Sequence, residues 1–149
     1  MSRDATVEVL NELIRTSEDG RRGFEAAAEK AHDPRLKTTF AEHARSCAAA
    51  ASELQQLVRS FGGKPVDSGS IAGAAHRGWV RARAAAGDNN VAVLEEVERG
   101  EDVAKATYTR ALQAPLPADV RALLERQYHG VLRNHDSVRG LRNQYRAGA

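Results

Sequence analysis

Glutamate and histidine side chains on long predicted helices are the residues of this sequence that could do chemistry. In helical bundles, a pair of metal ions is held by an inward Glu from each of two helices and a Glu-x-x-His pair from each of the other two. Residues three positions apart share a helix face, so such a pair can bind one metal cluster. The only Glu with a His three residues later is Glu29, with His32. This pair lies at the end of a predicted helix, which is the wrong height for such a site.

The positions at which complete motifs would be expected carry other residues. At mid-height of the second predicted helix, the inward pair is Ala44 and Cys47. In the last predicted helix, the pair that ends at His135 begins with Leu132. The sequence therefore predicts a degenerate metal site.

Polar side chains nevertheless recur near mid-height on the inward and flanking faces. The candidate metal ligands are Glu18, Glu98, Glu101 and His135. The expected polar core consists of Glu101, Gln127, Asn134 and His135. Carboxylates and an imidazole could bind iron or manganese and support redox or oxygen chemistry.

Glu101 is the most informative of these residues because it falls in the inward heptad stripe. A buried carboxylate is costly unless it is paired. Glu101 therefore requires a metal ion, Gln127, His135 or an arginine such as Arg21 as partner, or else exposure to solvent. His135 has two interpretations of its own, a boundary histidine hydrogen-bonded to a carboxylate and a metal ligand.

Apolar residues recur every three or four positions in long segments, which predicts an all-α protein. The expected helices span residues 5–32, 34–61, 90–113 and 118–146, with a shorter crossover helix at 70–86. Asp33-Pro34 separates the first two helices tightly, so these should be antiparallel neighbours. The connection to the third long helix can run the full bundle length, which is the topology of ferritin-like folds. We expect one four-helix-bundle domain over residues 1–149; an up-down bundle with the middle helix across one end is the alternative.

Composition supports a helical core and excludes several classes of function. Hydrophobic residues make up 42% of the 149 residues and aromatic residues 5%, and alanine, the best helix former, is abundant. A mean hydropathy of -0.52 argues against a membrane span. A net charge of +2 is too weak to favour nucleic-acid binding. One cysteine and no apolar signal segment at the start predict a cytoplasmic protein.

Cys47 and Trp79 need separate interpretations. Cys47 lies on an alanine-rich apolar face without a cationic neighbour, so we expect a small structural hydrophobe. Trp79 lies within the predicted crossover helix. It either anchors that helix to the bundle or contacts a second subunit, because tryptophan is favoured at interfaces. Trp79 is therefore the interface candidate for an expected homodimer.

Short motifs follow one another in order along nearly the whole chain. They are Asn11-Glu12-Leu13-Ile14, Asp19-Gly20, Gly23-Phe24, Gly69-Ser70, His76-Arg77-Gly78-Trp79, Glu98-Arg99-Gly100-Glu101, Tyr108, Leu116-Pro117, Gln127-Tyr128 and His135-Asp136-Ser137-Val138-Arg139. Together they resemble a bacterial family of ferritin-like four-helix-bundle proteins of unknown function. The resemblance implies the fold and a bacterial source, and it implies no activity, cofactor or catalytic residue.

We therefore expect a non-enzymatic ferritin-like bundle with a structural or partner-binding role, a degenerate metal site and no resident cofactor. The alternative is a non-standard di-metal or mono-metal carboxylate protein that uses iron or manganese. A third hypothesis, binding of nucleic acid or an acidic partner, depends on the arginines of the last helix and of the crossover. We expect neither a membrane nor a nucleic-acid partner, and the sequence does not identify a protein partner.

Overall fold

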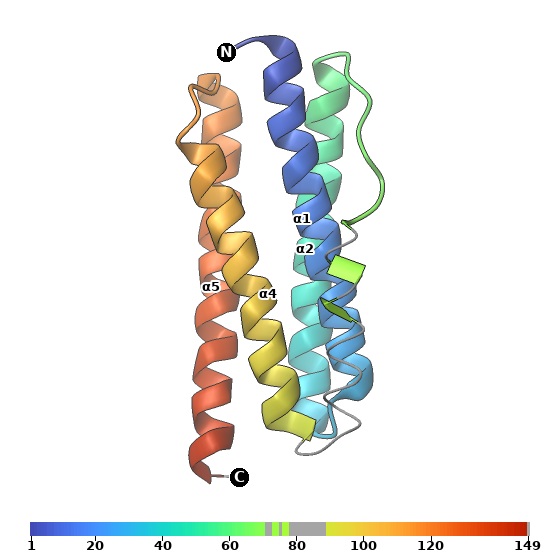
Figure 1. Cartoon of the computed structure of the whole chain (residues 1–149), viewed down its shortest axis with the longest axis vertical. Helices are drawn as coiled ribbons and strands as arrows, with labels where there is room; N and C mark the ends of the chain where they lie inside the picture. Colours follow the sequence, from blue (N-terminus) through green and yellow to red (C-terminus); the bar gives the residue numbers. More distant parts are fainter. Residues whose placement is uncertain (71–72, 75, 78–88, 149) are drawn as a thin grey trace.

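The computed structural model describes residues 1–70, 73–74, 76–77 and 89–148. Within these residues, four long helices pack side by side (Figure 1). They are α1 (Arg3–Lys30), α2 (Pro34–Ser60), α4 (Asn89–Leu112) and α5 (Ala118–Gly148). The described part contains no strand. The protein is an all-α four-helix bundle.

Polar caps and glycine decide where the first two helices begin and end. α1 begins two residues before the expected position, because the Ser2 side chain caps it by accepting a hydrogen bond from the Ala5 N–H at 3.1 Å. Asp33 caps α2 in the same way, and Pro34 occupies the first turn. Beyond α2, Gly62 has φ +75°, a left-handed conformation that glycine adopts readily.

The described part of the connection that follows α2 runs back along α1 (Figure 1). Near the start of α1, Asn11 Oδ1 accepts a hydrogen bond from the Val66 N–H at 3.0 Å. Further along α1, Asp19 accepts one from the Ser70 N–H at 2.8 Å. At the far end, Asn90 Oδ1 accepts one from the His32 N–H at 3.2 Å. The chain therefore crosses the length of the bundle before α4 begins, and α4 runs parallel to α2.

Most of the predicted crossover helix at 70–86 lies outside the described residues. Residues 73, 74, 76 and 77 are helical. The Ser70 hydroxyl accepts a hydrogen bond from the Gly73 N–H at 2.9 Å, which is the geometry of a helix cap. Trp79, the interface candidate, is also outside the described part.

The helices form two antiparallel pairs, α1 with α2 and α4 with α5, and α1 also packs against α4. Direct contact between α2 and α5 is slight. One salt bridge spans this weak contact, from the Arg126 guanidinium to the Glu53 carboxylate at 2.6 Å. The bundle is therefore loosely closed along the α2 and α5 side.

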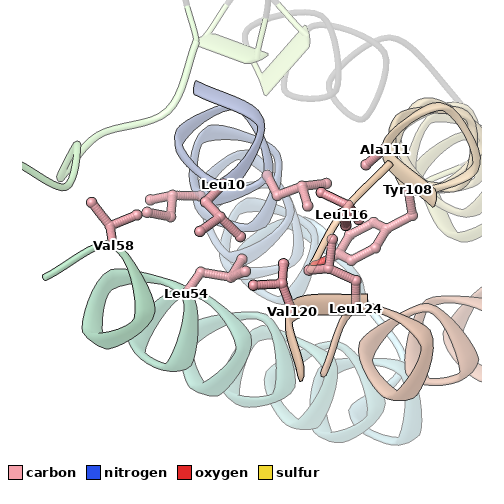
Figure 2. Packing of buried hydrophobic residues seen from close by; sticks show 10 residues of the cluster. Leu10, Leu54, Val58, Tyr108, Ala111, Leu116, Val120 and Leu124 are labelled. Carbon is pink, nitrogen blue, oxygen red and sulfur yellow. The ribbon is translucent and has the colours of Figure 1, made fainter. Parts of the chain in front are cut away.

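Two apolar clusters fill the bundle, one toward each end. Figure 2 shows the first cluster, to which α1 contributes Leu10, α2 Leu54 and Val58, and α5 Val120 and Leu124. The second cluster consists of Phe24, Ala27, Ala31, Leu36, Phe40, Ala44, Val93, Leu94, Val97 and Val138. Between the two clusters lie buried polar residues from three helices, so the bundle has a polar layer near its middle.

None of the described helices has a stretch both long and apolar enough to span a lipid bilayer.

Candidate functional site

A cavity of about 510 Å³ lies in the polar layer, and all four described helices line it. Small residues account for much of the space, because they leave the gap between facing helices unfilled. They are Gly20, Gly23, Ser46, Ala49, Ala50, Gly100, Ala104 and Gly130. Larger side chains such as Phe24, Val97 and Tyr108 complete the wall. The alanine-rich composition thus produces space as well as close packing.

Glu101 lines this cavity with only 6% of its surface exposed. Its carboxyl makes no hydrogen bond or ion pair with any residue that the structure describes, so Gln127, His135 and Arg21 are not its partners. Solvent exposure, the remaining non-metal alternative, is wrong. Desolvation by burial, with a smaller contribution from the nearby Asp102 carboxylate, raises the pKa of Glu101 from 4.5 to about 8. At neutral pH the Glu101 side chain is therefore mainly an uncharged carboxylic acid.

Glu18 is buried but paired within its own helix. The Arg21 guanidinium, one turn further along α1, approaches its carboxylate at 2.6 Å. The same guanidinium also contacts Glu25 at 2.9 Å. Glu18 is thus a neutralised carboxylate that shares its cation with a surface residue.

Glu98 is half-buried and forms an ion pair with Arg142 of α5. The pair joins α4 to α5 near the C-terminal end of the chain. A metal ion at Glu98 would have to displace this guanidinium.

His135 is buried, with 6% of its surface exposed, and is bonded to a carboxylate of α4. Its Nε2 lies 2.6 Å from Asp102 Oδ1, and its Nδ1 lies 3.7 Å from Asp136. These contacts match the interpretation of a boundary histidine bonded to a carboxylate. The sequence did not identify Asp102 as its partner, because Asp102 falls beside the inward stripe. Asn134, one residue earlier, is half-buried at the cavity wall.

Gln127 is the centre of a hydrogen-bond chain that crosses the bundle. The Tyr108 hydroxyl donates to Gln127 Oε1 at 2.9 Å. The Gln127 amide donates in turn to the Ala50 carbonyl and to Glu53, each at 3.2 Å. Ser17 completes the chain 3.5 Å from the Tyr108 hydroxyl. The sequence predicted Gln127 as a polar core residue but did not identify Tyr108 or Ser17 as its partners. A tyrosine in an inward apolar stripe is readily interpreted as a packing residue, and its hydroxyl is then overlooked.

Cys47 faces Glu101 and remains a thiol. Burial raises the pKa of Cys47 to about 12, with a further contribution from the Glu101 carboxyl. A Cβ added to Gly20 of α1 would lie 2.9 Å from its Sγ. Cys47 therefore behaves as the small packing residue that the sequence predicts, and it lacks the thiolate that a nucleophile or a metal ligand requires.

The described residues do not fit the di-metal centre that a ferritin-like fold implies. They include no group of three or more His, Cys, Asp or Glu side chains placed to hold one ion. Of the four candidates, Glu18 and Glu98 are paired with different arginines, His135 is paired with Asp102, and Glu101 is paired with none of the described residues. A metal at any of them would require breaking an existing pair or deprotonating Glu101.

The arginines of α5 are mostly engaged with carboxylates. Arg126 pairs with Glu53, Arg139 with Asp136, and Arg146 with Glu95. These pairs neutralise the helix face that the nucleic-acid hypothesis needs. Electrostatic binding to phosphates requires uncompensated cations, so this hypothesis gains no support from the contacts.

Comparison with known proteins gives the family and the fold. Among solved structures, a mutant of Mycobacterium smegmatis Dps1 is similar, with a TM-score of 0.74 and 11% identity over 94% of this chain and 98% of that chain. At this identity the likeness shows the fold, a ferritin-like four-helix bundle. No curated protein sequence matches. Residues 5–114 match the family described as domain of unknown function (DUF2383). Because this match covers most of the chain, the protein belongs to the DUF2383 family.

Proposed function

We propose that this protein is a non-enzymatic binding protein, in which the polar layer supports the bundle and its cavity instead of holding a metal pair. One observation carries the proposal: each candidate carboxylate is neutralised by a separate partner. Arg21 neutralises Glu18, Arg142 neutralises Glu98, and a proton neutralises Glu101 at neutral pH.

The physical argument rests on what a metal centre needs. Iron and manganese bind several deprotonated ligands that converge on one point. In this bundle the arginines already supply the positive charge that a metal would bring. The chain thus resembles a metal bundle in topology, with ion pairs and a cavity in place of the ligand set. The alternative, a non-standard metal protein, would need Glu101 to ionise and recruit a neighbour.

Elemental analysis tests this proposal. Protein expressed without a histidine tag in medium supplemented with iron and manganese is expected to carry far less than one metal per chain. A Glu101→Gln variant should contain the same small amount as the wild type. Stoichiometric iron or manganese in the wild type that disappears in Glu101→Gln would contradict the proposal and support the metal alternative.

The proposal includes a homodimer in the bacterial cytoplasm that binds a further partner. The presence of a tryptophan in the crossover segment supports self-association, because tryptophan is enriched in interface centres. The single cysteine, a half-buried free thiol, suits a reducing compartment.

A further inference from the structure

We propose that the cavity in the polar layer binds a neutral, largely apolar organic molecule bearing a carbonyl or similar acceptor, which takes a hydrogen bond from Glu101. This inference rests on the proposed binding function and specifies the class of ligand. It depends on two independent observations, the cavity and the unpartnered side chain that faces it.

The cavity has the size of a small-molecule site. Its volume of about 510 Å³ lies within the range of roughly 300–1,000 Å³ that is typical of such sites. Exposed residues of α2 and α5, namely Ala49, Arg126 and Arg133, also line it. The cavity therefore reaches the surface where these two helices make little contact, and this is the expected route of entry.

The wall of the cavity selects an apolar molecule with few polar groups. Phe24, Val97, Ala104 and Val131 supply apolar surface from three helices. The polar groups of Tyr108 and Gln127 are already used in bonds to each other and to α2. Among the lining residues of the described part, a hydrogen-bonding group is still offered by the half-buried His76 of the crossover, whose Nε2 has no hydrogen-bond partner, and by Glu101. Glu101 is the more deeply buried of the two, and its carboxyl lies between the helices.

A neutral acceptor suits Glu101 better than an ion does. Burial keeps the Glu101 carboxyl protonated at neutral pH, because its pKa is about 8. A carboxylic acid donates a hydrogen bond to a carbonyl without placing any charge in the cavity, and burying a charge is costly. A cation would need Glu101 to ionise first. The arginines that line the cavity in the described part, Arg99, Arg126 and Arg133, all lie at exposed positions, so an anion beside Glu101 would be far from their compensating charge.

The other titratable groups around Glu101 leave its proton undisturbed. Cys47 of α2 and Tyr108 of α4 both have pKa values raised to about 12 and are uncharged. Most other charged groups nearby in the described part are paired: Asp19 with Arg77, Glu53 with Arg126, Arg99 with Glu96, Asp102 with His135, and Glu18 with Arg21. His76 of the crossover also lines the cavity, and its Nε2 lies 3.7 Å from the Glu96 carboxylate. Arg133, at the surface end of the cavity, adds a positive charge that disfavours cationic ligands.

Prodan, a neutral naphthyl ketone whose fluorescence shifts to shorter wavelength in apolar surroundings, is a suitable probe. We expect the full chain to bind prodan with such a shift at about pH 6. Above the pKa of Glu101, affinity should fall about tenfold for each pH unit, because the ionised carboxylate can no longer donate. Affinity that is independent of pH, or that rises with pH, would overturn the proposal.

Variants locate the probe. Glu101→Gln keeps a hydrogen-bond donor that does not titrate. It should therefore bind prodan with the same affinity below and above the pKa of Glu101. Glu101→Leu removes the donor and should weaken binding about tenfold at about pH 6. Ala104→Leu fills the cavity and should abolish binding, whereas Ala106→Leu, on the exposed face of the same helix, should not. Prodan binding that survives both Glu101→Leu and Ala104→Leu would place the probe elsewhere and overturn the assignment.

Competition defines the ligand class. Acetylnaphthalene should displace prodan, whereas the cation naphthylethylamine, the anion naphthylacetate and the hydrocarbon ethylnaphthalene should compete at least tenfold less well. Stronger displacement by the amine would show that the cavity prefers a cation and would overturn this proposal.

Circular dichroism checks that each variant folds. If Ala104→Leu fails to fold, the pH dependence of prodan binding to Glu101→Gln tests the proposal in its place. Absence of probe binding together with a metal-free protein would refute this inference alone, whereas stoichiometric metal would refute the proposed function.

Discussion

Glu101 couples the stability of the bundle to pH. Burial raises its pKa from 4.5 to about 8 in the folded protein, whereas the unfolded chain has the ordinary value. Between these two values the folded state holds a proton that the unfolded state has released, so stability falls as pH rises through this window. Below pH 4.5 Glu101 is protonated in both states and does not change the free energy of unfolding with pH. Above about pH 8 it is ionised in both states, and the loss of stability no longer grows. Each unit of difference in pKa is worth about 1.4 kcal/mol.

Replacement of Glu101 by Leu should therefore stabilise the protein increasingly with pH. The gain in free energy of unfolding over the wild type should grow between about pH 5 and pH 8, exceed about 1.4 kcal/mol, and then level off. Urea denaturation at several pH values, followed by circular dichroism, measures it. Glu125→Leu, at an exposed position of α5, is the control and should show no such trend. An identical difference at every pH would show that the Glu101 pKa is ordinary.

Tyr108 offers a second test at the same scale. Its hydroxyl donates to Gln127 Oε1 in the interior, so Tyr108→Phe leaves a buried acceptor unsatisfied. We expect a loss of about 1–3 kcal/mol in the free energy of unfolding. Tyr128→Phe removes a hydroxyl that accepts a bond from exposed Thr109 at 3.2 Å and should cost less than about 0.5 kcal/mol. Equal losses in the two variants would mean that the bond across the bundle contributes nothing specific.

At the scale of elements, α1 guides the chain from α2 to α4. Asp19 accepts hydrogen bonds from the Ser70 N–H at 2.8 Å and from the Ser70 hydroxyl at 2.6 Å. A Cβ at Gly69 or Gly73 would collide with the Asp19 carboxylate, so glycine permits this close approach. One acidic side chain on a rigid helix thus holds the start of the crossover against the bundle.

Asp19→Ala should release this segment without unfolding the bundle. We expect trypsin to cut after Arg77 several times faster than in the wild type, because proteolysis follows local opening. Asp67→Ala, at an exposed position of the same connection, is the matched control and should be cut at the wild-type rate. The anchoring role of Asp19 would be refuted by unchanged cleavage in Asp19→Ala.

At the scale of the whole molecule, the described surface offers little apolar area for self-association. Val103, 63% exposed, and Met1 are its exposed large hydrophobic side chains. The proposed dimer therefore depends mainly on the crossover segment and Trp79. Analytical ultracentrifugation should give twice the chain mass of 16.1 kDa for the wild type and a monomer for Trp79→Ala. Val103→Ala should remain dimeric. If Trp79→Ala is still a dimer, Trp79 is not needed for the interface. If the wild type is a monomer, the dimer proposal is refuted.

Sequence reasoning predicted the bundle from local signals. The heptad stripes, the Asp33-Pro34 boundary and Gly62 act within a few residues along the chain, so they can be read without tertiary contacts. Gln127 could be recognised in the same way, as a polar residue in an apolar stripe. Asp102 and Tyr108 could not, because their roles depend on which side chain of another helix faces them.

What the sequence determined by itself was the all-α architecture and the incomplete metal-binding motifs, since helix periodicity and motif spacing are local properties. The choice between a full-length crossover and an up-down bundle came from the contacts of residues 66, 70 and 90 with α1 and the residues just after it. Tertiary structure alone decided how Glu98 and Glu101 were neutralised, whereas Glu18 pairs with Arg21 within one helix. Arg142 lies far along the chain from Glu98, and the distance between such groups follows from helix packing. The tertiary structure also decided that Glu101 faces a cavity and not a partner side chain. Such a space arises where small residues of separate helices meet.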